Sequence, residues 1–185
     1  MAQTSTAVSD LVLALSSFYA AYRINGHPFQ SFYGLLVIGL AASLGAFRFA
    51  LTNPSLDLID AHKVFSWLGS IVGVPLLTAG LFKHHGYTDI TLIFTYVPLG
   101  FLFLYKILPQ AARDCGNAAL SVVSVLSMVL ICSIAWNVYG IASSLVIIFA
   151  AGTGTDGLRF GVPNVDLFHY LLATSNICYM YAVKF

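Results

Sequence analysis

The residues with the most chemical capacity are a histidine and an aspartate in the last apolar stretch of the chain. His169 follows Asp166 by three residues, a spacing that puts both side chains on one face of a helix, and Asn176 continues that face. A histidine that is oriented by a carboxylate and faces a cavity is suited to general acid–base catalysis or to metal ligation. The structural alternative is that Asp166 caps the start of the helix and a neighbouring helix satisfies His169.

A second group of chemically capable residues lies between Asp57 and Lys63. Asp57, Asp60 and His62 offer carboxylate oxygens and imidazole nitrogens as ligands, and Asp60 is suited to cap the helix that follows. The structural alternative is an interfacial cap with a salt bridge between Asp60 and Lys63. Together the two groups give four candidate catalytic residues: His169, Asp166, His62 and Asp60.

Other signatures of catalysis or of a cofactor are missing from the sequence. It contains no GxSxG, no HExxH and no phosphate-binding glycine loop. A catalytic zinc ion needs three protein ligands and an open position, and neither group above supplies that set. Cys115, Cys132 and Cys178 form no CxxC pair. We therefore expect no cofactor and leave open whether a metal ion binds.

Composition indicates what kind of element must position these residues. Of the 185 residues, 59% are hydrophobic and 8% are charged, whereas a soluble domain carries about 25% charged residues. Such a chain cannot build a water-facing surface, so we expect an integral membrane protein with a single transmembrane helical domain, residues 1–185. The formal net charge of +1 and the lack of a basic patch exclude nucleic acid as a partner and leave the lipid bilayer.

Stretches without Asp, Lys or Arg are long enough to cross a bilayer, which takes ~20 mostly apolar residues in a helix. The stretch 115–155 is too long for one span and is expected to fold back near Trp136 to Gly140. The sequence therefore predicts an all-α, polytopic transmembrane helix bundle of seven helices. Six is the alternative, because the first and sixth are short. The predicted helices are 8–23, 31–51, 63–82, 88–107, 116–136, 138–152 and 166–183.

The distribution of Lys and Arg predicts the orientation of these helices. With seven spans, one side of the membrane carries the N-terminus with Arg48, Lys63, Lys106, Arg113 and Arg159, and the other carries Arg23, Lys83 and Lys184. Because cytoplasmic loops carry the excess of basic residues, the N-terminus is predicted to be cytoplasmic. On this topology His62 and His169 both stand near the start of an odd-numbered helix, so they can converge.

Small residues predict where helices touch. Ala41-xxx-Gly45 and Gly69-xxx-Gly73 repeat a small side chain one turn apart, which lets two helix backbones approach closely inside a membrane. Such faces serve packing within the bundle, self-association or contact with another membrane protein. We therefore expect membrane-protein partners or self-association through them.

Several segments resemble the transmembrane protein 276 family of small multi-pass membrane proteins. They are Ser9-Asp10-Leu11-Val12-Leu13, Gly73-Val74-Pro75-Leu76-Leu77, Asn137-Val138-Tyr139-Gly140 and the segment from Asp166 to Tyr181 with its Ala173 and Ser175. They follow one another along most of the chain with similar spacing. The resemblance implies a compact multi-pass membrane protein and transfers no site residues, because that family has no established activity.

The sevenfold layout is also loosely similar to the seven-helix membrane hydrolases that include alkaline ceramidases and adiponectin-type receptors. That resemblance implies a zinc-binding His-xxx-His pair in the last helix. Here the position four residues after His169 is Ala173, so the pair is incomplete.

Two functions fit these observations. The first is a non-enzymatic membrane component, either an accessory subunit or a bundle that binds a lipid or another hydrophobic ligand. The alternative is a membrane-embedded lipid hydrolase or transferase that uses His169 and Asp166 with His62 and Asp60. Whether the protein is an enzyme depends on whether these four residues meet around a cavity.

Overall fold

The computed structural model describes residues 3–25, 28–159 and 161–185, and these are helical apart from short connections and one pair of two-residue strands. Seven helical segments follow one another, as expected, because α3, η1 and α4 run on as one helix from Leu56 to His84. The elements are α1 (Thr4–Ile24), α2 (Phe29–Ala50), α3 (Leu56–Leu68), η1 (Gly69–Gly73), α4 (Val74–His84), α5 (Thr88–Leu104), α6 (Gln110–Ile134), α7 (Val138–Thr153), β1 (Leu158–Arg159), β2 (Val162–Pro163) and α8 (Asn164–Ala182).

Three helices in the described residues are long and apolar enough to cross a membrane. They are Phe29–Ala50, Leu56–His84 and Gln110–Ile134, and α5 and α7 are shorter apolar helices. The helices α1 and α8 are long, but they carry most of the buried polar side chains. By length and composition the structure thus holds three candidate membrane spans in an all-helical chain.

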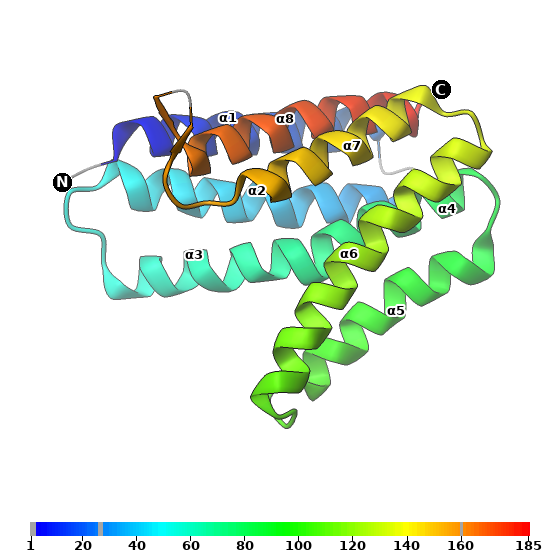
Figure 1. Ribbon diagram of the computed structural model, residues 1–185, viewed down its shortest axis with the longest axis horizontal. Coiled ribbons are helices and arrows are strands. Elements are labelled where there is room, and N and C mark those ends of the chain that lie inside the picture. The colour runs from blue at the N-terminus through cyan, green and yellow to red at the C-terminus, as the bar shows by residue number, and fades with distance from the viewer. Residues whose placement is uncertain (1–2, 26–27, 160) are drawn as a thin grey trace.

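The helices form one main layer of neighbours and one divergent arm. Figure 1 shows α1, α2, α3, α7 and α8 lying alongside one another, whereas α5 and the first half of α6 run obliquely away from them. α1 packs against both α2 and α8, although α8 ends the chain that α1 begins. The start of α1 is also tied to the end of α2, because the Gln3 N–H donates to the Phe49 carbonyl over 2.9 Å.

Two helix starts differ from the sequence prediction. The third helix begins at Leu56 rather than at residue 63, and Ser55 caps it by accepting a hydrogen bond from the Leu58 N–H. Asp60 therefore lies within the second turn, and its predicted role as the cap is wrong. The last helix begins at Asn164, so Asp166 lies inside its first turn and does not cap it either.

The third helix contains a π-helical turn at Gly69–Gly73, directly before Val74 and Pro75. Proline has no N–H to donate, so it breaks the regular hydrogen-bond ladder, and a π-turn is one way in which a helix absorbs the break. The turn also brings backbone close to α2, since a Cβ at Gly34 would lie 2.9 Å from the Gly73 carbonyl oxygen. The predicted small-residue contact is confirmed at Gly73 but not at Gly69, where nothing lies within 4 Å of a built Cβ.

The long apolar stretch 115–155 folds back where the sequence predicted it. α6 ends at Ile134 and α7 begins at Val138, with Trp136 in the left-handed region at φ 54°. The Asn137 side chain accepts a hydrogen bond from the Gly140 N–H and so caps α7. The two halves of the stretch therefore become two adjacent helices.

Candidate functional site

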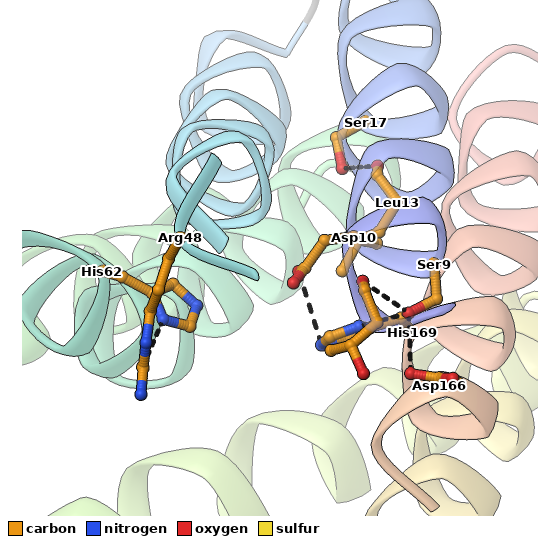
Figure 2. A network of polar contacts seen from close by, with 9 residues as sticks. Ser9, Asp10, Leu13, Ser17, Arg48, His62, Asp166 and His169 are labelled. Carbon is orange, nitrogen blue, oxygen red and sulfur yellow. Dashed lines mark hydrogen bonds and ion pairs between the residues drawn. The ribbon is translucent and has the colours of Figure 1, made fainter. Parts of the chain in front are cut away.

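Two residues of α1 and two of α8 form a buried polar cluster, which we call the acid–histidine cluster: Ser9, Asp10, Asp166 and His169. The Ser9 Oγ lies 3.0 Å from Nδ1 of His169 and 3.2 Å from Oδ1 of Asp166. On the other side of the imidazole ring, Nε2 of His169 lies 3.5 Å from Oδ1 of Asp10. Figure 2 shows the ring held between Ser9 and Asp10, with Asp166 beyond Ser9. The histidine is thus oriented from both of its nitrogens.

The hydrogen bonds favour one arrangement of protons. If Nδ1 of His169 donates to Ser9, the one Ser9 hydroxyl proton is left for its two acceptors, Oδ1 of Asp166 at 3.2 Å and the Thr6 carbonyl at 3.0 Å. Nε2 then faces the Asp10 carboxyl, and one proton shared between these two groups makes their contact favourable. Asp166 and Ser9 therefore position the ring, whereas Asp10 and Nε2 form the pair that can take up or release a proton.

Burial makes an ionised form of these carboxyl groups unfavourable in free energy. Asp10 is 1% exposed and Asp166 is 2% exposed, and an ionised carboxylate needs partners when it leaves water. Within the described residues, Oδ2 of Asp10 is buried and has no hydrogen-bond partner. Buried polar atoms in native proteins are nearly always paired, so an unpaired carboxylate oxygen calls for an explanation.

Gly45 of α2 leaves room for the Asp10 side chain. A Cβ built on Gly45 would lie 2.5 Å from Oδ2 of Asp10 and 2.7 Å from its Cγ. Any larger residue at this position would push the carboxylate away from α2. The small-residue contact that the sequence predicted at Gly45 is therefore confirmed, and its neighbour is an ionisable group rather than another apolar helix face.

The cluster opens onto a cavity of about 520 Å³, a size in the usual range for small-molecule sites, ~300–1,000 Å³. Residues of α1, α2, α3, α4, α6, α7 and α8 line it, and most of its wall is apolar, including Leu13, Leu77 and Val125. Asp10 and His169 are among its polar lining residues. The pair that can exchange a proton thus faces an apolar space that is partly open to the surface.

His62 lines the same cavity from α3, so the structure brings His62 and His169 to one site, as the topology predicted. Nδ1 of His62 lies 2.9 Å from the guanidinium of Arg48 on α2. Because arginine can only donate, Nδ1 of His62 accepts this bond and carries no proton. Figure 2 shows the Arg48–His62 pair set apart from the acid–histidine cluster.

Asp60 does not join this site. Its side chain is 74% exposed and lies 3.5 Å from the Lys63 ammonium, one turn along the same helix. The salt bridge is the structural alternative that the sequence offered. Of the four predicted site residues, His169 and His62 line the cavity, Asp166 supports His169 through Ser9, and Asp60 lies outside.

Sequence reasoning missed Ser9, Asp10 and Arg48 as parts of the site. A signal was present in α1, where buried positions recur every three or four residues, at Thr6, the adjacent pair Ser9 and Asp10, Leu13 and Ser17. A stripe of small and polar residues on one face of an otherwise apolar helix indicates a face turned toward protein rather than lipid.

Other polar side chains on α8 serve packing. The Asn176 amide donates to Ser17 Oγ over 2.9 Å, and Ser143 and Ser175 bond each other over 2.9 Å. Tyr179 is fully buried, donates to the Leu77 carbonyl over 2.7 Å and lies 2.5 Å from Ser31 Oγ. We call Ser31, Tyr179 and the Leu77 carbonyl the tyrosine cluster.

In the connection after α4, His85 lies outside the predicted spans. Burial and the neighbouring His84 hold the pKa of His85 below its ordinary value, so this side chain is neutral near pH 7. It makes no part of the cavity wall.

No group of three or more His, Cys, Asp or Glu side chains in the described ranges is arranged to hold a metal ion. Ala173, which stands where a second zinc histidine would be needed, is buried and packs with Leu13, Ala14 and Ala42. No protein-family model, no curated protein and no solved structure matches the chain, so the resemblance to the transmembrane protein 276 family stays a prediction.

Proposed function

We propose that the chain is a multi-pass membrane protein that binds an amphiphilic ligand, with the ligand's apolar chain in the cavity and a hydrogen-bond donor of its polar end at Asp10 and His169. The observation that carries this proposal is Oδ2 of Asp10, a buried and unpaired carboxylate oxygen beside a largely apolar cavity. Oδ2 itself is buried against Gly45, so a rotation of the Asp10 carboxyl group toward the cavity would let a hydroxyl or amine of a bound ligand give that oxygen its missing partner.

The distribution of side chains supports the membrane part of the proposal. Large apolar residues are exposed on every α-helix of the bundle except α4, among them Leu15 (61%), Phe47 (67%) and Phe149 (69%). The buried positions instead include carboxylates, a histidine and several hydroxyls. This arrangement, apolar outside and polar inside, suits a lipid surrounding and is unfavourable in water.

Lipid is the natural source of such a ligand. The cavity is partly open and is bounded by several helices with apolar outer faces, so a chain from the bilayer can enter between them. Transfer from one apolar surrounding to another gives little free energy. Binding would therefore depend on the polar end, where Asp10 and His169 stand.

A pair of tryptophan variants on α3 tests the proposal. Ser66 lines the cavity, whereas Val64 is 50% exposed and is not a lining residue. Ser66→Trp places an indole at the cavity wall, at a position that is also exposed, and Val64→Trp adds the same bulk two residues away. Protein purified from membranes should carry a defined lipid, measured by extraction and mass spectrometry, that Ser66→Trp loses and Val64→Trp retains. Equal lipid content in all three proteins would contradict the proposal.

A second candidate function is a membrane-embedded lipid hydrolase or transferase. It is favoured by the hydrogen-bonded order Asp166, Ser9, His169, with Nε2 of His169 facing Asp10 and the cavity. In such an enzyme His169 would be the acid–base group and His62 an electrophilic partner. Asp60, exposed and paired with Lys63, has no part in it.

Turnover of an acyl lipid by the purified protein tests this second candidate. His169→Ala should abolish turnover, and Asp166→Asn should reduce it, because the amide no longer accepts as strongly from Ser9. Zinc content measured on the same samples decides whether a metal takes part. Unchanged turnover in both variants would end the enzymatic alternative.

A further inference from the structure

We propose that Arg48 and His62 form an anion-binding site at the polar end of the cavity, and that the ligand is a single-chain amphiphile with an anionic head group and a hydroxyl beside it. A lysophospholipid has this chemistry. The inference rests on the proposed function and adds to it the class of ligand.

Arg48 has binding capacity that the protein does not use. It lies in the last turn of α2, half-buried, and one of its N–H groups bonds His62. In the described part of the chain no carboxylate comes within 4.0 Å of its guanidinium. The guanidinium has five N–H donors in a planar fork, and this geometry matches the oxygens of a phosphate or a carboxylate.

The guanidinium is held in place by aromatic contacts. Its central carbon lies 4.9 Å from the centre of the Phe49 ring, and the Phe49 ring meets the His62 ring edge-on at 5.6 Å. A cation above an aromatic face is attracted by the ring. Arg48 is thus positioned before a ligand arrives, which lowers the entropy lost on binding.

Arg48 and Asp10 lie at different depths along their helices, in the order in which a lysophospholipid carries its anionic head and its hydroxyl. Arg48 lies two residues from the end of α2, about 3 Å along the helix axis, whereas Asp10 lies six residues from the start of α1, about 9 Å. Both helix ends lie on the same side of the bundle, joined by the bond from Gln3 to Phe49. An anionic head at Arg48 would therefore lie nearest the membrane surface, with the hydroxyl at Asp10 and the chain deeper.

Charge explains why the anion and the hydroxyl must be separate groups. An anion placed at Asp10 would be repelled by the neighbouring Asp166 carboxylate and would meet no cation, because Asp10 and His169 share one proton and are neutral as a pair. At Arg48 it meets a cation; Arg48 does not itself line the cavity, and its hydrogen bond to the lining residue His62 connects it to that space. Because hydrocarbon chains dissolve equally well in the bilayer, this contact is the one that would distinguish the ligand from other lipids.

The test compares binding of three compounds to the purified protein in a neutral detergent: lysophosphatidic acid with an oleoyl chain, monooleoylglycerol, and glycerol 3-phosphate. The first two differ by the phosphate alone, and the third has no chain. Wild-type protein should bind the lysophosphatidic acid at least about tenfold more tightly than monooleoylglycerol, because hydrogen bonds to charged groups are the strong ones. Glycerol 3-phosphate should bind far more weakly than either lipid.

Two variants test whether Arg48 causes the preference for lysophosphatidic acid over monooleoylglycerol. Arg48→Gln should bring the lysophosphatidic acid down to the affinity of monooleoylglycerol and leave monooleoylglycerol binding unchanged. Lys63→Gln removes a nearby exposed cation and should keep the preference. If Arg48→Gln does not fold, Arg48→Lys keeps the charge without the fork and should lower the preference.

The outcomes separate this inference from the proposed function. Equal wild-type binding of the two lipids would overturn the anion site and leave the proposed function standing, as would a preference that survives in Arg48→Gln. Binding of glycerol 3-phosphate as tight as that of the lipid would also overturn it, because the anion would then bind without the cavity. If neither lipid binds, the proposed function fails together with the inference.

Discussion

Two buried polar clusters use side chains of α8, and they differ in whether their hydrogen bonds are complete. In the tyrosine cluster, the Tyr179 hydroxyl donates to the Leu77 carbonyl and bonds Ser31, so its donor and acceptor are both used. In the acid–histidine cluster, Asp10 keeps one buried oxygen without a partner, and Asp10 and His169 face the cavity. The fold completes the hydrogen bonds of the first cluster, whereas the second keeps an unpaired oxygen that, on the proposed function, a ligand donor would pair.

The difference indicates which polar groups are structural. Both clusters stand beside a glycine that leaves them room, Gly80 for the tyrosine cluster and Gly45 for Asp10. Position on a helix and neighbouring glycines therefore do not distinguish them. The acid–histidine cluster is distinguished by an unpaired carboxylate oxygen on a residue that lines the cavity. Stability alone would favour pairing that oxygen or removing its charge.

The largest expected effect is on the tyrosine cluster. A Cβ at Gly80 would overlap Ser31 Oγ and lie 2.7 Å from the Tyr179 hydroxyl. Gly80→Ala should lower the free energy of unfolding by about 1–3 kcal/mol, as overpacking of a filled core does. Thermal unfolding in detergent measures it. Gly100→Ala on α5, where nothing lies within 4 Å of the new Cβ, is the control and should cost nothing. Equal melting temperatures for the two variants would contradict the packing account.

Removing the tyrosine hydroxyl should have the next largest effect. Tyr179→Phe leaves the buried Leu77 carbonyl and Ser31 hydroxyl short of a partner, at a cost of about 1–3 kcal/mol. Tyr170→Phe changes the same helix at a ring that is 40% exposed and should have little effect. Chemical unfolding of both variants tests the contrast. A Tyr179→Phe protein as stable as the wild type would show that the cluster is not structural.

Removing the charge of Asp10 should change stability less than either of these. Asp10→Asn keeps the size of the side chain and removes a buried carboxylate, so the free energy of unfolding of ligand-free protein should stay within about 1 kcal/mol of the wild type or rise. Ligand binding should weaken at the same time. Unfolding of delipidated protein measures the first part. A large loss of stability would make Asp10 a structural residue like Tyr179.

The smallest effect is expected at Asp60. Its ion pair with Lys63 is exposed on both sides, so Asp60→Asn should change the free energy of unfolding by at most about 0.5 kcal/mol. Binding and stability should both match the wild type. If Asp60→Asn, measured beside Asp10→Asn, lost ligand binding, Asp60 would belong to the binding site despite its exposure.

Much of the helical layout could be predicted, because charge-free stretches and turn residues are local properties. The turn at Asn137 is one example, since its cap on Gly140 needs no distant partner. The start of the third helix differs from the prediction because Asp57, Asp60 and Lys63 lie before the charge-free stretch on which the prediction depends. Ser55 instead caps two further turns whose charged side chains face outward.

The site itself was predicted in part. The three-residue spacing of Asp166 and His169 is local, and it correctly placed both on one face of α8. Their partners come from the opposite end of the chain, with Ser9 and His169 separated by 160 positions. No local pattern relates α1 to α8, so the pairing follows only from the packing of the two helices.

Native mass spectrometry of the protein released from detergent tests the central claim most directly, by counting bound amphiphile on each molecule. The account predicts that wild-type protein and Tyr179→Phe both carry the ligand and that Asp10→Asn loses it, since Asp10 is the cavity-lining residue that keeps a buried oxygen without a partner in the described part of the chain. Equal occupancy in wild-type protein and Asp10→Asn would contradict the account.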